Sequence, residues 1–266
     1  MSGFFNPTVA GITLRATLSR KRALLFALPA LILILFTVAL KVSRPPSRPW
    51  PSHVLGTFGF SVLLPLTALI IGTSVLGAEI DDGSIIHLLA TPVRRLSVIM
   101  TKFAVATVLT MVFAAVPELI AALISGGGDA PDKVSNGAGG VVNFTQGAAI
   151  SGSKFALGLF IGALAGSLIY NAIFVMVSVA TTRAIAVGLL YVLIWEALLS
   201  NFVSGARLLS VSHYGLGIAN GIANDPGLNA GLGVVTSVVM GAIVTVAALA
   251  LAVNLLSSFT LKGDPA

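Results

Sequence analysis

Cysteine is absent from this chain, and charged residues are scarce. Without a thiol, the chain offers no disulfide, no thiolate metal site and no iron–sulfur cluster. Asp, Glu, Lys and Arg together make up only 9% of its 266 residues, against about 25% in soluble domains. Lys and Arg form no long run, so the net charge of +6 does not indicate nucleic-acid binding. This composition excludes an ordinary soluble domain, a disordered chain and a disulfide-rich scaffold.

Apolar residues, in contrast, are abundant: they make up 56% of the chain, and the mean hydropathy is +1.03. A helix needs about 20 such residues to cross a membrane. Six stretches of roughly that length carry almost no charge. We therefore expect an all-α integral membrane protein with six transmembrane helices in a single domain, residues 1–266. The expected spans are 23–40, 54–78, 103–124, 155–180, 185–199 and 232–256.

The distribution of Lys and Arg predicts which side of the membrane each connection faces. Counted on alternate sides of the spans, nine lie on the side of the N-terminus and six, Lys41 among them, on the other. Four of the nine precede the first span, where positive charge usually determines orientation. We therefore expect both termini in the cytoplasm, in a multi-pass protein of the bacterial plasma or inner membrane.

The segments outside the spans differ in composition. Residues 125–153 are rich in Gly, Ser, Asn and Asp, which predicts a flexible external loop. Residues 201–231 mix apolar side chains with glycines, which favours short helices at or dipping into the outer surface. Before the first span, a narrow apolar stripe with helical spacing predicts an amphipathic helix within residues 1–22. The stripe consists of Phe5, Val9, Ile12 and Ala16.

The cytoplasmic connection 79–102 has the most distinctive sequence. Three carboxylates precede an apolar cluster, Asp82 or Ser84 can cap a helix, and Pro92 disfavours its continuation. We expect a helix of about two turns over 84–90, too short to be stable alone in water. Its apolar side chains are Ile85, Ile86, Leu88 and Leu89. They either fill a partner's groove, or pack on the ends of the protein's own spans or in the lipid interface.

A series of positions in this connection forms a recognisable pattern. The positions are Glu79, Gly83-Ser84, Leu88-Leu89-Ala90-Thr91-Pro92, Arg94-Arg95 and Lys102. The pattern resembles the cytoplasmic coupling loop of the ABC type-2 permease family: Glu, Gly-Thr, Leu-Leu-x-x-Pro, a basic residue and a Lys at the next helix. Ser84 replaces the usual Thr, and Asp81 and Asp82 stand where basic or mixed residues are frequent.

The resemblance implies an exporter permease, with a transport pathway formed by two permease chains. Two separate cytoplasmic ATPase subunits would drive transport, each holding one 84–90 helix in a groove. The resemblance also implies an elbow helix within 1–22, short external helices within 201–231, and contact with membrane lipid. The coupling residues that it implies are Glu79, Asp82, Gly83, Ser84, Ile85, Ile86, His87, Leu88, Leu89, Pro92, Arg94 and Arg95.

The chain is not expected to be an enzyme or to hold a cofactor. Its nearest match to a phosphate-binding loop, residues 147–154, has Lys154 one position late and Phe155 in place of the required hydroxyl residue. ATP and Mg²⁺ are therefore expected to bind in the partner ATPase. The three histidines lie in separate connections and form no metal motif. An intramembrane enzyme is disfavoured because the expected spans contain no Asp and no His.

Two carboxylic acids, Glu118 and Glu196, lie inside expected spans. A carboxylate in hydrocarbon costs a few kcal/mol or more and usually faces a cavity or a partner. Each is a candidate for the substrate pathway, where it would meet a cationic or hydroxylated substrate or pair with Arg207. The alternative is an interfacial position, which Trp195 favours for Glu196.

Two further features bear on packing and cargo. Gly158, Gly162 and Gly166 repeat every four residues, which predicts close helix packing, within this chain rather than between copies. With only 3 Tyr and 2 Trp beside 14 Phe, the chain is poor in the amphipathic rings that sugars prefer. We therefore expect a hydrophobic or amphiphilic cargo such as a drug, an antibiotic or a lipid. A membrane anchor or sensor that binds an ATPase without transport remains the alternative.

Overall fold

The structure, a computed structural model, describes residues 6–18, 20–43, 50–81, 95–128, 135–136, 140–141, 152–200 and 204–258. In this part of the chain the regular structure is helical apart from two short antiparallel strands, β1 (Ser135–Asn136) and β2 (Gly140–Val141). The first half contains α1 (Pro7–Thr17), α2 (Arg20–Ser43), α3 (Pro51–His53), the π-helix η1 (Val54–Leu63), α4 (Leu64–Asp81), α6 (Arg95–Thr110), the π-helix η2 (Met111–Ala115) and α7 (Val116–Ser125). The second half contains α8 (Gly152–Ala180), α9 (Ala184–Leu190), the π-helix η3 (Tyr191–Leu199), the 3₁₀-helices η4 (Ser204–Leu209) and η5 (Pro226–Leu228), α11 (Val211–Ala223) and α12 (Val234–Ser258).

Five of these helical segments are long and apolar enough to cross a membrane. They are Ala23–Ser43, Pro51–Gly77, Arg95–Ser125, Gly152–Ala180 and Val234–Ser257. The fifth expected span, 185–199, corresponds to the shorter apolar segment Ala184–Leu199, formed by α9 and η3. The expectation of an all-α membrane protein is therefore confirmed, and the helices extend a few residues beyond several of the expected bounds.

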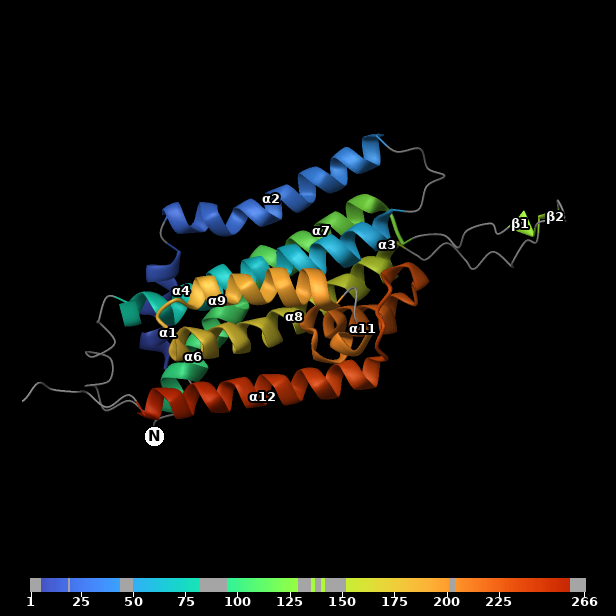
Figure 1. Ribbon diagram of the computed structural model, residues 1–266. Helices are drawn as coiled ribbons and strands as arrows, with labels where there is room; N and C mark the ends of the chain where they lie inside the picture. The colour runs from blue at the N-terminus through green and yellow to red at the C-terminus, as the bar shows by residue number, and fades with distance from the viewer. Residues whose placement is uncertain are drawn as a thin grey trace, which may run out of the picture.

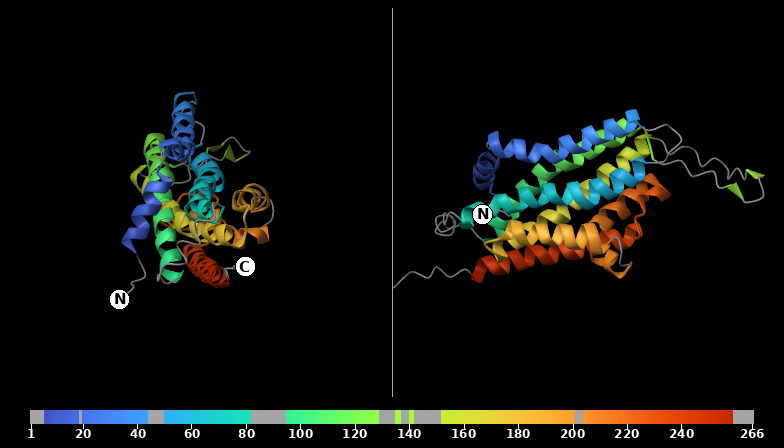
Figure 2. Two further views of the ribbon diagram at one scale, coloured as in Figure 1. Left: turned by 90° about the vertical axis from the view of Figure 1, so that its left-hand side faces the viewer. Right: turned by 45° about the horizontal axis from the view of Figure 1, so that its top comes forward.

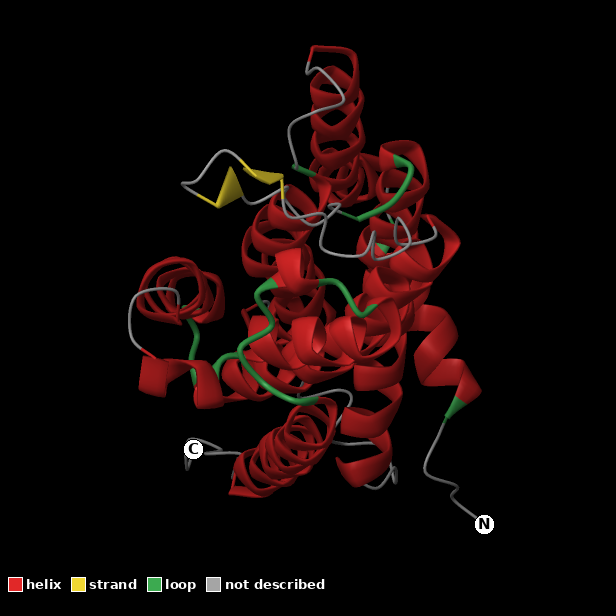
Figure 3. Ribbon diagram, turned by 90° about the vertical axis from the view of Figure 1, so that its right-hand side faces the viewer, coloured by secondary structure: helices red, strands yellow, loops and turns green. Residues whose placement is uncertain are grey.

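The helices form an elongated bundle with α8 at its centre (Figure 1). α8 packs against α4, α7, α11 and α12. Viewed end-on, α2 and α12 lie at opposite edges of the bundle, and α9 with η3 lies to one side (Figures 2 and 3). The span that contains α4 is mostly buried inside the protein, whereas the spans formed by α2 and α12 are mostly uncovered. Their exposed apolar side chains are those expected of helices that face lipid.

Helix α1 begins with a well-formed cap. The Asn6 side chain accepts hydrogen bonds from the N–H groups of Thr8 (3.0 Å) and Val9 (3.4 Å), and Pro7 occupies a first-turn position that needs no donor. The expected stripe is wrong in part, because the residues that α1 buries are Val9, Thr13 and Thr17, whereas Ile12 is 62% exposed. α1 packs on α6, and the Asn6 N–H donates to the Thr101 hydroxyl of α6 at 3.0 Å.

The regularly spaced glycines of α8 lie where another helix approaches closely. A Cβ added to Gly158 or Gly162 would lie 2.6 Å or 2.5 Å from a backbone carbonyl oxygen of α11, and one added to Gly166 would meet Leu64. The expectation of packing within the chain is therefore confirmed. The short helices expected within 201–231 are also present, and α11 is largely buried. The helix α11 thus belongs to the packed bundle rather than to a solvated loop.

Candidate functional site

The carboxyl group of Glu118 is buried inside the bundle. Glu118 lies in the first turn of α7, after Pro117, which lacks the N–H that a continuous α-helix uses, and after the π-helix η2. Its side chain is only 4% exposed, and its Oε1 atom has no hydrogen-bond partner in the described part of the chain. The carboxyl group is thus enclosed by the protein rather than open at its surface.

The glycine at position 59 forms the surface against which this carboxyl group lies. A Cβ added to Gly59 would lie 2.6 Å from each carboxylate oxygen of Glu118. Any side chain at this position would therefore displace the carboxyl group. The sequence contains no motif that marks Gly59, and only the approach of η1 to α7 reveals its role.

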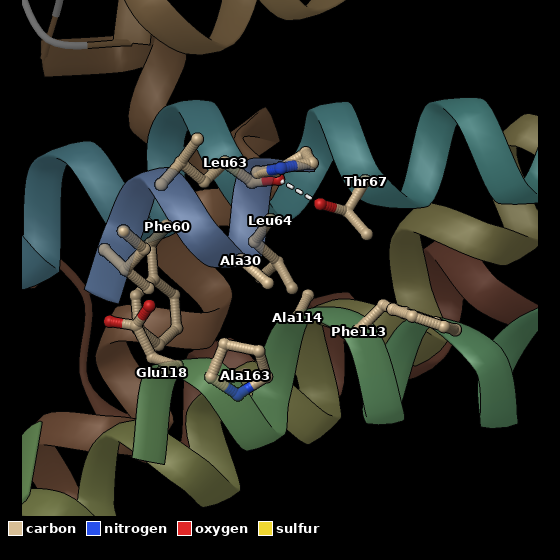
Figure 4. Close-up of a pocket in the computed structure, with 12 residues that line it drawn as sticks. Ala30, Phe60, Leu63, Leu64, Thr67, Phe113, Ala114, Glu118 and Ala163 are labelled. Carbon is tan, nitrogen blue, oxygen red and sulfur yellow. Dashed lines mark hydrogen bonds between the residues drawn. The ribbon is translucent and has the colours of Figure 1, made fainter. Parts of the chain in front are cut away.

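Glu118 borders a small pocket between α2, the η1–α4 segment, the η2–α7 segment and α8 (Figure 4). Apart from Glu118, its lining is apolar except for Thr67, whose hydroxyl donates to the Leu63 carbonyl at 2.8 Å. The apolar lining residues are Pro29, Ala30, Leu33, Phe60, Leu63, Leu64, Phe113, Ala114, Pro117 and Ala163. A mostly apolar hollow with one unsatisfied acidic group is a typical ligand-binding arrangement.

The second predicted acid, Glu196, has a different environment. It is fully buried in η3, where Oε1 accepts from the Tyr191 hydroxyl (2.9 Å) and the Val211 N–H (2.8 Å). Its Oε2 accepts from the Ser210 hydroxyl (2.6 Å) and from the hydroxyl (2.7 Å) and N–H (3.3 Å) of Ser212. Glu196 therefore caps the N-terminus of α11, where backbone N–H groups and the helix dipole both favour an anion.

Two observations bear on the expectations about Glu196. Its carboxylate is enclosed by the protein, although the neighbouring Trp195 ring is partly exposed and donates to the Leu209 carbonyl at 3.2 Å. The buried Nε atom of Arg207, the suggested partner, has no hydrogen-bond partner among the described residues. The donors around Glu196 follow it by 14 to 16 residues in the chain, apart from Tyr191. Sequence spacing alone therefore could not identify them.

At the opposite end of the bundle, most of the predicted coupling loop lies outside the described residues. This applies to Asp82, Gly83, Ser84, Ile85, Ile86, His87, Leu88, Leu89, Pro92 and Arg94. Glu79 belongs to the last turn of α4. Arg95, the first residue of α6, donates from Nη1 to the Leu256 carbonyl at 2.8 Å and to the Ser257 carbonyl, and so caps the C-terminal end of α12.

The lysine that completes the loop pattern, Lys102, has a structural contact in α4. Its side chain is fully buried, and its Nζ atom donates to the Val75 carbonyl at 2.8 Å. A buried ammonium group is stable only with such partners. Lys102 thus links α6 to α4, the two helices that flank the predicted coupling loop.

Comparison with known proteins identifies the class to which this helical bundle belongs. A sequence profile described as "ABC-2 family transporter protein" matches residues 17–194, which is more than half of the chain. The chain therefore belongs to the ABC-2 transporter family, as the coupling-loop pattern predicts. Members of this family are generally non-catalytic membrane permeases that work with a separate ATPase subunit. A search of curated proteins returned no match.

We also searched the described residues for a metal-binding site. They contain no group of three or more His, Asp or Glu side chains that could hold a metal ion. His213 instead lies between two backbone carbonyl oxygens, those of Ala230 (3.0 Å) and Ser200 (3.3 Å). The histidine therefore has a structural environment, and the Glu118 pocket is the candidate for ligand binding that we consider further.

Proposed function

We propose that this chain is the transmembrane permease subunit of an ABC exporter in the bacterial plasma or inner membrane. It crosses the membrane six times with both termini in the cytoplasm, and residues 1–22 contain its elbow helix. A second permease copy completes the substrate pathway. Two cytoplasmic ATPase subunits bind ATP and Mg²⁺ and engage the 84–90 helix of each permease. The cargo is hydrophobic or amphiphilic, for example a drug, an antibiotic or a lipid.

The family match over residues 17–194 carries this proposal. The Glu118 pocket supports a role in transport, because a buried acid whose Oε1 atom lacks a partner among the described residues is costly unless it serves a ligand or a proton. The contacts of Arg95 and Lys102 support force transmission, since they tie α6 to α12 and to α4 beside the coupling loop. We assign Glu118 to the substrate pathway and Glu196 to the attachment of α11.

The first test is association with an ATPase. The tagged chain, extracted gently from its native membrane, should retain a stoichiometric ATPase with vanadate-sensitive activity. The double substitution Leu88→Asp and Leu89→Asp should abolish this association, because charged side chains cannot enter an apolar groove. Membrane insertion should be unaffected, since the 84–90 helix lies outside the expected spans.

The chain provides a matched control for this test. Leu208 and Leu209 are an adjacent leucine pair in η4, both exposed, on the side predicted to be external. Their replacement by Asp makes the same chemical change and should leave the ATPase bound. Association that survives the 88/89 change would overturn the coupling assignment. An associated ATPase without any transported cargo would instead favour an anchor or sensor.

A further inference from the structure

The Glu118 pocket contains an acceptor but lacks donors. Of the residues that line it, only Glu118 and Thr67 have polar side chains, and the Thr67 hydroxyl hydrogen is used by the Leu63 carbonyl. Glu118 Oε1 is buried without a partner in the described part of the chain, and the carboxyl group lies directly on Gly59. Since buried polar groups are nearly always satisfied, the pocket is complementary to a ligand that brings its own donor.

We propose that this pocket binds a lipophilic primary amine, whose ammonium group is held by the Glu118 carboxylate. The inference rests on the proposed permease function only for the idea that the bound amine is cargo. The binding of the amine is argued from the buried Glu118 carboxyl group and the apolar lining of the pocket alone. An ammonium group would supply both the charge and the donors that this carboxylate lacks, whereas an anionic headgroup would meet a carboxylate and no basic side chain among the lining residues.

Aromatic and small side chains favour the same ligand class. Phe60 and Phe113 both line the pocket, and Phe60 lies beside Glu118 (Figure 4); the face of such a ring attracts an ammonium group. Ala30, Ala114 and Ala163 also line it, so little side-chain volume fills the space between the helices that carry them. The ligand's polar end would therefore lie against α7 and its apolar part among alanine and leucine side chains.

The position of α2 explains why the ligand should carry a hydrocarbon tail. α2 lies at an edge of the bundle and is mostly uncovered (Figure 2). One side of it contributes Pro29, Ala30 and Leu33 to the pocket, while Leu31 and Leu35 on its other side are more than half exposed. A tail that leaves the pocket beside α2 would thus enter lipid, where burying each CH₂ group is favourable.

The direct test uses the full-length protein in nanodiscs of phosphatidylcholine and tritiated dodecylamine as the probe. We expect saturable binding that Glu118→Gln weakens at least tenfold, because the neutral amide lacks the charge that attracts the ammonium group. Ile120→Gln is the matched control: it places the same amide on α7 at a position 39% exposed, and it should bind dodecylamine as the wild type does. Equal binding by the Glu118→Gln variant would overturn the proposal.

Two competitors identify the headgroup chemistry. 1-Dodecanol has the same tail with a neutral hydroxyl, and dodecanoate has a negative charge. Neither should displace dodecylamine at equal concentration. Displacement by dodecanol would overturn the amine assignment in favour of a hydroxylated ligand, and displacement by dodecanoate would show that the tail alone determines binding.

A photolabel keeps the proposal testable if the Glu118→Gln variant does not fold. Dodecylamine that carries a diazirine near its amine should label the wild-type protein at Phe60, Phe113 or Leu33. Labels confined to the outer face of α12 would overturn the proposal. If the protein does not bind the amine but still binds an ATPase, the amine site is overturned and the permease function stands. If it binds the amine but no ATPase, the amine site stands and the permease function is overturned.

Discussion

Glu118 and Glu196 are buried carboxylic acids with opposite surroundings. Glu196 accepts hydrogen bonds from Tyr191, Ser210, Ser212 and two N–H groups of α11, whereas Glu118 Oε1 accepts none from the described residues. A buried charge costs several kcal/mol unless hydrogen bonds or a counter-charge compensate it. Replacement by glutamine should therefore change stability differently at the two positions.

At Glu196, we expect glutamine to destabilise the fold. One carboxylate oxygen becomes an NH₂ group that faces hydroxyl or amide donors, so the free energy of unfolding should fall by about 2 kcal/mol. Thermal unfolding in detergent would measure the loss, and hydrogen exchange of α11 should accelerate. Tyr191→Phe, which removes a single donor, is the milder comparison. An unchanged unfolding temperature together with unchanged exchange would contradict the capping role.

At Glu118, we expect glutamine to be neutral or stabilising by up to about 1 kcal/mol, because it removes a buried carboxylate whose Oε1 atom has no partner among the described residues. The same substitution should alter substrate-stimulated turnover more than assembly. The contrast between stability and turnover separates a ligand-binding acid from a structural one. A large loss of stability would indicate that Glu118 instead holds the helices together.

At the scale of the helices, the contact between α8 and α11 depends on glycine. Gly162→Ala would place a methyl group 2.5 Å from the Gly215 carbonyl oxygen and 2.8 Å from the Ala219 Cβ. Because neither atom belongs to a flexible side chain, we expect a loss of about 1–3 kcal/mol from overpacking. Thermal unfolding is again the measurement. Gly11→Ala is the control, since nothing lies within 4 Å of an added Cβ there and alanine favours helix.

The sequence predicts the helices better than the contacts between them. Apolar length is a local property, and every one of the six apolar stretches is helical in the structure. The spacing of Gly158 and Gly162 likewise predicts close packing, although it does not identify α11 as the partner. The prediction of which face α1 buries is wrong in part, because Thr13 and Thr17 are buried there whereas Ile12 is exposed. Apolar character alone does not decide burial when lipid or headgroups surround a helix.

The candidate site, too, could be predicted from the sequence only in part. Both intramembrane acids could be singled out from the sequence, because charge is rare and costly there. Their roles depended on residues distant in the chain: Gly59 for Glu118, and Ser210 and Ser212 for Glu196. Such contacts follow from lateral packing, which no local pattern encodes.

At the scale of the whole molecule, side-chain hydrogen bonds join helices at both ends of the bundle. At one end, Asn6 donates to Thr101 and Arg95 caps α12, so α1, α6 and α12 meet there. At the other end, Lys41 donates to the Ile124 carbonyl and Ser52 to Asp225, so α2, α7, α3 and η5 meet. Lys41 is one of the cations that the proposed orientation places outside. Its contact with the end of α7 gives this positive charge a capping role that does not depend on sidedness.

The absence of cysteine permits a direct test of this orientation. Ser43 at the end of α2 and Thr182 between α8 and α9 are both exposed and belong to opposite ends of the bundle (Figure 1). With an impermeant maleimide on intact cells, Ser43→Cys should be labelled, and Thr182→Cys should be labelled only after permeabilisation. The cysteine-free parent provides the unlabelled control. The reverse pattern would place the termini outside, and the predicted coupling loop would then be unable to reach a cytoplasmic ATPase.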